Sequence, residues 1–433
     1  MVSARQPNRP HFLQVAGRGC EVLFYSTFHG ARLIARALRP GALRRESHQE
    51  LLGRFLAELF ESLGAAFIKI GQILSSRPDL LPASIITHLR RLQDEVAPFD
   101  VRRIPRLIEE ALGRPMEEVF ESFDLEPVSS ASIAHVHRAR LADGRHVAVK
   151  IRRPAAVRQV STDLRWFSWM ARLLDQLPPL RILPLSEAVG EVGEAVAQQL
   201  DFRLEAENNR RFREHFRGHR NVAIPELVEE LCSDSVLTME FMDRLEKVGI
   251  TDLPRESRET STLVGLKALF KMIFIDGFIH ADLHPGNFFL RPEGEVVLLD
   301  MGLVARLVGD NLQHFKDFFF GLVANDGRKC ARVVDETATY RAPEFDRRRF
   351  EESMVRLIAH HSRLNAEEFE VTAFVYQLFD IQRRHRLRGS THFTMTILSL
   401  AVYEGIVKQL YPQLDFQRQA LAFLVKHRLN TQG

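Results

Sequence analysis

The segment that most constrains this chain consists of two short motifs, HADLHPGN at 280–287 and VVLLDMG at 296–302. Asp282 and Asn287 stand five residues apart in the first motif. Asp300 follows Asp282 by eighteen residues, at the end of an apolar run that reads as a strand. Any fold of this chain has to present these two carboxylates and one carboxamide in this order.

The spacing of Asp282 and Asn287 is that of the protein-kinase catalytic loop H-R-D-x-x-x-x-N. Asp300-Met-Gly matches the kinase D-F-G with Met in place of Phe. Phosphoryl transfer builds charge on phosphate oxygens, so the protein supplies Mg²⁺ ligands and a carboxylate that orients the nucleophile. The two motifs therefore predict a kinase-type nucleotide site.

Length and composition set the outer limits. With 433 residues, 45% of them hydrophobic, the chain can form two or three domains. The 59 basic and 56 acidic residues nearly balance, which gives no reason to expect nucleic-acid binding. Three scattered cysteines predict neither a disulfide framework nor a zinc site, so a reducing cytoplasmic compartment is the default. No apolar run reaches about 18 residues, so we expect no transmembrane helix.

The segment 11–38 mixes apolar side chains with arginines at helical spacing. One interpretation is a basic amphipathic helix that lies on a membrane surface. The simpler interpretation, a helix packed on the rest of the protein, is the more frequent outcome for such a pattern.

The predicted secondary structure changes near Pro127. Residues 1–125 read as helical, and short strands are predicted after them. The predicted strands are 133–139, 146–151 and 236–241. A long helix, which Pro184 interrupts, is predicted at 180–216 between the second and the third strand. From Leu263 the pattern is helical, interrupted only by the catalytic segment. We therefore expect an α+β, bilobal kinase-like fold: a helical extension (1–125), a β-rich N-lobe (126–243) and a helical C-lobe (244–433).

VAVK at 147–150 predicts a buried strand that delivers Lys150 into a nucleotide site. An edge-strand lysine would look the same, but this one precedes Asp282 in the order that a kinase requires. Such a lysine needs a carboxylate on the long helix. Glu205 is the first choice, followed by Asp201 and Glu194. By order alone, 239–242 would form the hinge that contacts adenine.

The loop that would cover the phosphates, 129–136, contains no glycine. Glycine lets backbone N–H groups approach phosphates closely, so another part of the chain has to close the site. Lys69 and Gln72, neighbours on one helical face in the extension, are candidates. Gly71 between them costs helix stability, which indicates a close backbone approach. A surface lysine beside an incidental glycine is the alternative.

The tripeptide Ala342-Pro343-Glu344 spells the kinase A-P-E. The residues between it and Asp300 read as helices at 311–323 and 328–334, not as an activation loop. We therefore interpret the tripeptide as a chance match that opens a helix, with Pro near its start.

Together these motifs resemble the UbiB/AarF-like atypical kinase family, whose members support ubiquinone biosynthesis. The similar stretches are FIKIGQILSSRPDLLP at 67–82, SSASIAHVHRA at 129–139, VAVK at 147–150, LDFRLEAEN at 200–208, HADLHPGN at 280–287 and DMG at 300–302. The first is the KxGQ region of the family and the second its alanine-rich loop.

The resemblance implies ATP or ADP and Mg²⁺ as cofactors. Lys150 would bind the α- and β-phosphates and pair with Glu205, and Asp282 would be the catalytic carboxylate. Asn287 and Asp300 would bind the metal. Lys69 and Gln72 would reach the active site from the extension. The remaining implied nucleotide contacts are Ala131, Ser132, Val136, Ala148, Glu240 and Met242.

Three features depart from the family pattern. The E-x-D of the long helix reads Gln199-Leu200-Asp201, and the alanine-rich loop starts with Ser129-Ser130. The apolar membrane hairpin that ends many bacterial members has no counterpart here, so we expect peripheral contact with the inner face of the membrane. The implied partners are lipid or phenolic quinone precursors and quinone-biosynthesis proteins, and a homodimer remains open.

Two other functions stay open at this stage. A small-molecule kinase of the aminoglycoside or choline type also uses an H-x-D-x-x-x-x-N loop. A nucleotide-binding scaffold without catalysis is the third hypothesis. The KxGQ region and the glycine-free loop favour an atypical kinase or ATPase over a small-molecule kinase. A scaffold without catalysis is disfavoured because the set of Lys150, Asp282, Asn287 and Asp300 is complete.

Overall fold

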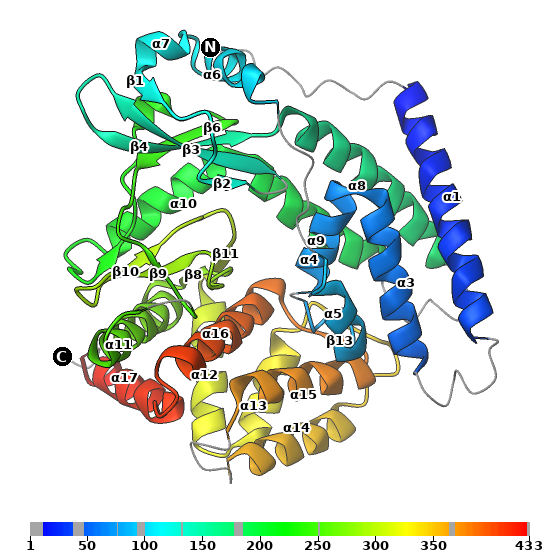
Figure 1. The fold of residues 1–433 in the computed structure, drawn as a ribbon. Coiled ribbons are helices and arrows are strands. Elements are labelled where there is room, and N and C mark those ends of the chain that lie inside the picture. The colour runs from blue at the N-terminus through cyan, green and yellow to red at the C-terminus, as the bar shows by residue number, and fades with distance from the viewer. Residues whose placement is uncertain are drawn as a thin grey trace. The chain divides into compact units, whose positions relative to one another are not determined.

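A computed structural model describes most of the chain in two compact units. The described residues are 12–37, 47–75, 77–92, 100–130, 133–176, 185–249, 252–362 and 369–430. Unit 1 comprises residues 1–203 and 228–240, and unit 2 comprises residues 204–227 and 241–433. The helical extension and the β-rich segment thus belong to one unit, and Figure 1 shows the elements of both.

Unit 1 combines helices with one antiparallel sheet. Its helices are α1 (Phe12–Ala37), α3 (His48–Leu63), α4 (Ala65–Ser75), α5 (Ala83–Leu89), η1 (Val101–Arg103), α6 (Ile104–Leu112), α7 (Met116–Val119), α8 (Pro154–Leu174), α9 (Leu185–Leu200) and η2 (Glu229–Leu231). Its strands are β1 (Phe120–Phe123), β2 (Ser129–Ser130), β3 (Ala134–Leu141), β4 (His146–Arg152) and β6 (Val236–Glu240).

The sheet of unit 1 has the order β1-β3-β4-β6, and β2 pairs with the start of β3. Burial alternates along β4, as expected for a strand with two different faces. Val147 and Val149 point into a core that includes Ile104 and Ile108 of α6. Lys150 therefore lies on the opposite face, and the predicted strands 133–139, 146–151 and 236–241 are confirmed within two residues at each end.

The KxGQ helix α4 is part of the core of unit 1. Ile70 shares an apolar cluster with Ile133, which precedes β3, and with Val196 of α9. A Cβ at Gly71 would overlap the side chain of Leu92 and come within 2.8 Å of Cδ2 of Phe60. The predicted close backbone approach is confirmed, and its partners are other residues of the extension.

Unit 2 is mainly helical. Its helices are α10 (Phe202–His215, whose first two residues belong to unit 1), α11 (Arg255–Lys271), the π-helical turn η3 (Met272–Asp276), α12 (Asp310–Val323), α13 (Gly327–Glu336), α14 (Arg347–His361), α15 (Val371–Arg384), α16 (Thr391–Leu410) and α17 (Phe416–Asn430). Its strands are β5 (Val222–Ala223), β7 (Glu246–Lys247), β8 (Phe278–His280), β9 (Phe288–Leu290), β10 (Val296–Leu298), β11 (Val304–Arg306), β12 (Tyr340–Arg341) and β13 (Leu387–Arg388).

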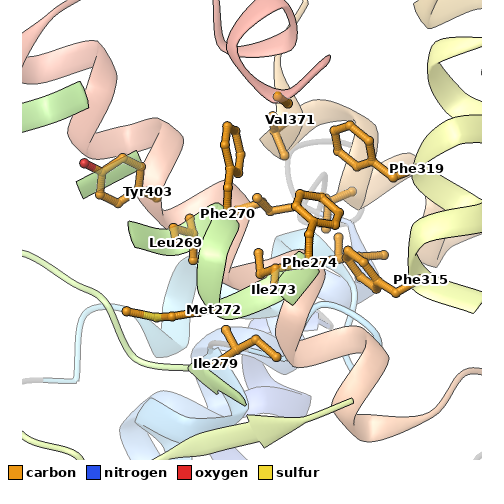
Figure 2. Close-up of a cluster of buried hydrophobic side chains, with 14 of the residues drawn as sticks. Leu269, Phe270, Met272, Ile273, Phe274, Ile279, Phe315, Phe319, Val371 and Tyr403 are labelled. Atoms are coloured by element: carbon orange, nitrogen blue, oxygen red, sulfur yellow. The ribbon is translucent and has the colours of Figure 1, made fainter. Parts of the chain in front are cut away.

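The core of unit 2 forms around the junction of α11 and η3. Figure 2 shows Phe270 and Phe274 from this junction close to Phe315 and Phe319 of α12. The rings of Phe274 and Phe319 lie 5.2 Å apart in an edge-to-face arrangement. Ile279 of β8 belongs to the same cluster, so the strand that leads into the catalytic loop is anchored in this core.

Four predictions for secondary structure were wrong in detail. Residues 120–123 form β1, because pairing with β3 extends the sheet. The predicted long helix 180–216 is interrupted at Asp201, and its part at 180–184 lies outside the described residues. Ala342-Pro343-Glu344 does not open a helix but precedes α14, which begins at Arg347 after the cap Asp346. The C-terminal region contains the strand pair β12–β13 in addition to helices.

The segment 11–38 forms α1 from residue 12 to residue 37. One face of α1 is packed, with Val22 buried and Arg18 bonded to Asp163 of α8 at 2.7 Å. The exposed part of α1 includes large apolar side chains, with 63% of Phe24 and 50% of Phe28 accessible. Among the described helices, none combines the length and apolar composition needed to cross a bilayer.

Candidate active site

Four short strands of unit 2 frame the two motifs. The catalytic loop connects β8 to β9, and Asp300 follows β10. β9 pairs antiparallel with β10, so that Leu298 faces Phe288. β11 pairs with β8, so that Val304 faces His280. These pairings bring both motifs to the same end of a small β structure.

Direct hydrogen bonds connect the two predicted catalytic-loop residues. Nδ2 of Asn287 donates to the backbone oxygen of Asp282 at 3.0 Å and approaches Oδ2 of Asp282 at 3.5 Å. The backbone oxygen of Asn287 accepts from the N–H of Leu299 at 2.9 Å. Asn287 is thus fixed between the catalytic loop and the strand end that carries Asp300.

His280 connects the same two segments through its ring. Its Nδ1 accepts from the backbone N–H of Asp282 at 3.2 Å, and its Nε2 lies 3.0 Å from the backbone oxygen of Leu299. These partners fit a neutral ring with the proton on Nε2. Complete burial lowers the pKa of His280 from its ordinary value, which favours the same neutral form. His280 therefore positions the backbone on both sides of the predicted metal site.

Asp300 has a left-handed backbone conformation, with φ of 56°. This region is uncommon for residues other than glycine, and such conformations concentrate at functional sites. Oδ1 of Asp300 accepts from the backbone N–H of Gly302 at 3.2 Å, which holds the carboxylate in a defined orientation. The position of Asp300 is thus set by both the backbone and the side chain.

Helix α10 is attached to this centre by Asn208. Nδ2 of Asn208 donates to the backbone oxygen of Met301 at 2.9 Å, and Oδ1 accepts from Arg306 at 3.3 Å. One turn further, Phe212 packs against Phe278 with a ring separation of 4.7 Å. Helix α10 therefore has a fixed position relative to the Asp-Met-Gly motif.

In unit 1, three predicted nucleotide-binding residues share one face of the sheet. Lys150 pairs with Val136 of β3, and directly opposed residues project to the same side. Ala148 lies two residues before Lys150 and therefore points the same way. The ammonium of Lys150 lies 5.2 Å from the ring centre of Phe202, which begins α10. The structure thus brings Val136, Ala148 and Lys150 together.

The three candidate partners of Lys150 differ in their surroundings. Glu205 is buried on α10, with 4% of its surface exposed. Asp201 is half-buried, and its Oδ1 accepts from the N–H of Arg203 at 3.0 Å, as an N-terminal cap of α10 does. Glu194 is exposed on α9. A buried carboxylate requires a compensating charge or donors, so this comparison favours Glu205, and the pair with Lys150 stays a prediction.

The loop and the extension are placed only in part. Ala131 and Ser132 lie outside the described residues. Lys69 lies in α4, but its side chain also falls outside what the structure describes. Nε2 of Gln72 lies 3.4 Å from the backbone oxygen of Leu92, a contact within the extension. Ile70 of α4 and Ile133, which lies within the loop segment 129–136, belong to the same apolar cluster.

The predicted hinge spans the change from unit 1 to unit 2. Glu240 is exposed at the end of β6, where it pairs with Val147, and Met242 is buried in unit 2. Their nucleotide contacts stay predictions.

The donor set of unit 2 fits Mg²⁺ bound together with phosphates. Because Nδ2 of Asn287 is directed to Asp282, its Oδ1 is the atom suited to a metal, and the carboxylate of Asp300 is the second predicted ligand. In the described part of the chain, no group of three or more His, Cys, Asp and Glu could hold a metal ion by itself. Magnesium in nucleotide sites typically has one or two protein ligands and completes its shell with phosphates and water.

The roles of three residues escaped sequence reasoning. His280 opens the recognised motif, yet its bridging function depends on the position of Leu299, nineteen residues later. Asn208 lies within LDFRLEAEN at 200–208, one of the stretches that resemble the family, so the sequence did offer a signal for it. Arg306, which donates to Asn208, carried no signal in the sequence.

Comparisons with known proteins agree with this geometry. Residues 91–334 match the ABC1 atypical kinase-like domain, and residues 354–415 match the UbiB helical domain. The first match covers more than half of the chain. The chain belongs to the UbiB-type atypical kinase family. The family resemblance seen in the motifs is therefore confirmed.

Individual UbiB relatives align over most of this chain. It is 32% identical over 400 residues to the "Probable protein kinase UbiB" of Vibrio cholerae, which covers 90% of this chain and 73% of the relative. The protein of the same name from Aliivibrio fischeri is 31% identical over 413 residues, covering 92% and 74%. A solved structure, the Rv3197–erythromycin complex from Mycobacterium tuberculosis, superposes with a TM-score of 0.53 at 25% identity, covering 78% of this chain and 87% of that one. The kinase-like α+β fold expected for this UbiB-type chain is confirmed.

Proposed function

We propose that this protein binds Mg-ATP and hydrolyses it, in support of isoprenoid quinone (ubiquinone) biosynthesis at the membrane. The observation that carries the ATP chemistry is the hydrogen-bonded assembly of Asp282, Asn287 and the Asp300 segment, which His280 joins. Phosphoryl transfer requires these groups and little else from the protein beyond positioning.

Each residue has a specific task in this proposal. Lys150 binds the α- and β-phosphates, and buried Glu205 keeps its ammonium in place. Asp282 accepts the proton of the attacking hydroxyl or water. Oδ1 of Asn287 and the carboxylate of Asp300 hold Mg²⁺, which when bound neutralises charge on the phosphate oxygens.

The extension supports an ATPase over a kinase that phosphorylates protein substrates. The curated relatives carry the name protein kinase, which would require access for a peptide. Here α4 is packed into the core of unit 1 through Ile70 and Gly71, so the KxGQ region is an integral part of the folded unit. We propose that Lys69 and Gln72 act at the phosphates and that the extension excludes protein substrates.

Contact with a membrane surface is supported by α1. Leu23, Phe24 and Phe28 are at least half exposed on its outer face, as is Trp169 of α8. Arg32 lies on the same helix with its guanidinium 5.7 Å from the ring centre of Phe28. Apolar side chains with flanking arginines are typical of helices that lie in the interface of anionic lipids. We propose a peripheral location on this face.

The test is phosphate release from Mg-ATP by the purified full chain, with and without anionic vesicles or a phenolic quinone-precursor analogue. We expect lipid-stimulated release that disappears in Asp300→Asn. Phosphate release unchanged in that variant would contradict the metal assignment. Strong phosphorylation of generic peptides would contradict the exclusion of protein substrates.

The membrane part has its own control. The double variant Phe24→Ser/Phe28→Ser should lose vesicle binding and lipid stimulation but keep the release measured without vesicles. The matched variant Val355→Ser replaces an apolar residue of α14 that is 36% exposed and lies in unit 2. Equal loss in both variants would contradict a membrane role for α1.

A further inference from the structure

Unit 2 contains a pocket that none of the predicted catalytic residues lines. Its volume is about 620 Å³, within the range of small-molecule sites. It lies between the segment that follows α10, the second half of α11 and helix α17. Helices α11 and α17 lie side by side (Figure 1).

The inner wall of the pocket is mainly apolar. Phe270 lines it and is itself anchored in the core of unit 2, as Figure 2 shows. The rings of Phe270 and Phe423 lie 5.5 Å apart, and the ring of Phe423 lies 4.3 Å from that of His427 in a tilted arrangement. Ile275 adds an apolar side chain that is 43% exposed. This wall offers a preformed surface to a hydrocarbon chain.

The charged residues that line the pocket are all basic. They are Arg220, Lys267, Lys271 and Lys426, and none of the described lining residues is acidic. Lys271 is neutralised by Asp276, with both carboxylate oxygens 2.7 Å from its Nζ. The other three form no ion pair with any residue that the structure describes, and they are exposed. The opening of the pocket therefore has an uncompensated positive charge.

We propose that this pocket binds a single-chain anionic amphiphile, with its head group at Lys267, Lys426 and Arg220 and its hydrocarbon chain against Phe270 and Phe423. An inorganic anion would leave the apolar wall unused, and a neutral chain would leave the basic rim unmatched. The rim and the wall together select a ligand that has both parts. This inference does not depend on the proposed ATP chemistry.

The test measures binding of dodecyl phosphate, below its micelle concentration, to the full chain by isothermal titration calorimetry without nucleotide. We expect one site per chain. Inorganic phosphate and dodecyl maltoside should each bind at least about tenfold more weakly, since each lacks one half of the match. Equal affinity for either of them would overturn the proposal. Binding to phosphatidylglycerol vesicles without binding of monomeric dodecyl phosphate would also overturn it, in favour of a membrane surface.

Two pairs of variants locate the site. Lys267→Glu/Lys426→Glu should weaken binding by about tenfold or more, whereas Arg332→Glu, at an exposed position on α13, should not. Ala422→Trp places a bulky ring at an exposed lining position, and Leu421→Trp places the same ring at the adjacent exposed residue outside the pocket. We expect loss of binding only in the first. Equal effects of the charge-reversing variants would show that binding depends on net charge. Equal effects of the two tryptophan variants would place the binding on a surface other than the pocket, and either result would overturn the proposal.

Discussion

At the residue scale, the candidate site depends on side chains that bond to backbone atoms of a second motif. His280 and Asn208 are not among the proposed ligands of ATP or Mg²⁺, yet they hold the backbone of Asp282, Leu299 and Met301 in place. Partners of this kind commonly matter nearly as much as the ligands that they orient.

Removal of the His280 ring should reduce catalysis without changing any proposed ligand of ATP or Mg²⁺. We expect His280→Leu to lower phosphate release by about 10- to 100-fold, because the backbone of Asp282 and the Asp300 segment lose their common anchor. His360→Leu, at an exposed histidine of α14, is the control and should have no effect. Full activity of a folded His280→Leu, with folding checked by urea titration, would contradict the positioning role.

A buried histidine of β3 should make unit 1 sensitive to acid. Burial, with smaller contributions from Arg153 and His137, lowers the pKa of His135 from 6.5 to about 4. Between these values the unfolded chain binds the proton and the folded chain does not, so stability falls as the pH falls below about 6.5. At pH 5 the expected loss in free energy of unfolding is about 2 kcal/mol.

This loss can be measured by urea unfolding at pH 7 and pH 5, followed by tryptophan fluorescence. Both tryptophans of the chain, Trp166 and Trp169, lie on α8 in unit 1, so the signal reports the unit that contains His135. His135→Phe should reduce the difference between the two pH values by about 2 kcal/mol. The same difference in the variant and the unaltered protein would show that His135 is not the group responsible.

At the element scale, helix α4 is the part whose position mattered most. The sequence placed Gly71 in a helix and indicated a close approach, and the structure supplies Phe60 and Leu92 as the partners. Helix α4 also contacts α9, and its Ile70 shares an apolar cluster with Val196 of α9 and with Ile133, which precedes β3. The KxGQ region is therefore held in place by protein packing alone.

Gly71→Ala should destabilise unit 1 by about 1–3 kcal/mol, because the added methyl group has no space against Phe60 and Leu92. Gly190→Ala, in α9, is the matched control. A Cβ there meets no heavy atom within 4 Å, so the substitution should stabilise its helix by up to about 1 kcal/mol. Urea unfolding followed by tryptophan fluorescence measures both, and a neutral or stabilising Gly71→Ala would contradict the close packing.

At the scale of the whole molecule, the residues that we predict to bind one nucleotide are divided between the two units. Lys150 belongs to unit 1, and Asp282, Asn287 and Asp300 belong to unit 2. If these residues bind one nucleotide, the bound nucleotide stabilises both units against unfolding. Loss of a ligand residue in one unit should then reduce the stabilisation of the other. The tryptophans in unit 1 make this linkage measurable.

Mg-ATP at a concentration 100 times its Kd should raise the unfolding free energy reported by tryptophan fluorescence by about 2.7 kcal/mol. Asp300→Asn should abolish this gain, although the substitution lies in unit 2 and the tryptophans lie in unit 1. Asp252→Asn, at an exposed loop position of unit 2, should leave it intact. A full gain in Asp300→Asn would show that unit 1 binds the nucleotide without the predicted metal ligand.

The sequence alone determined the family, the order of helical extension, β-rich segment and helical segment, and the strands around VAVK. These follow from local patterns: motif spacing, alternation along a strand and helical periodicity. Where the local pattern was weak, as at β1 and Asp201, pairing with β3 or a helix cap decided the outcome instead.

Tertiary structure alone decided which of these residues meet. His280 reaches Leu299 across a strand pair, Asn208 reaches Met301 from a distant helix, and the pocket joins Phe270 of α11 to Phe423 of α17. Such contacts depend on how apolar faces far apart in the chain pack together, which no window of neighbouring residues encodes. The sequence thus identified the chemical groups of the phosphate site, while packing determined which residues hold them in place and created the pocket between α11 and α17.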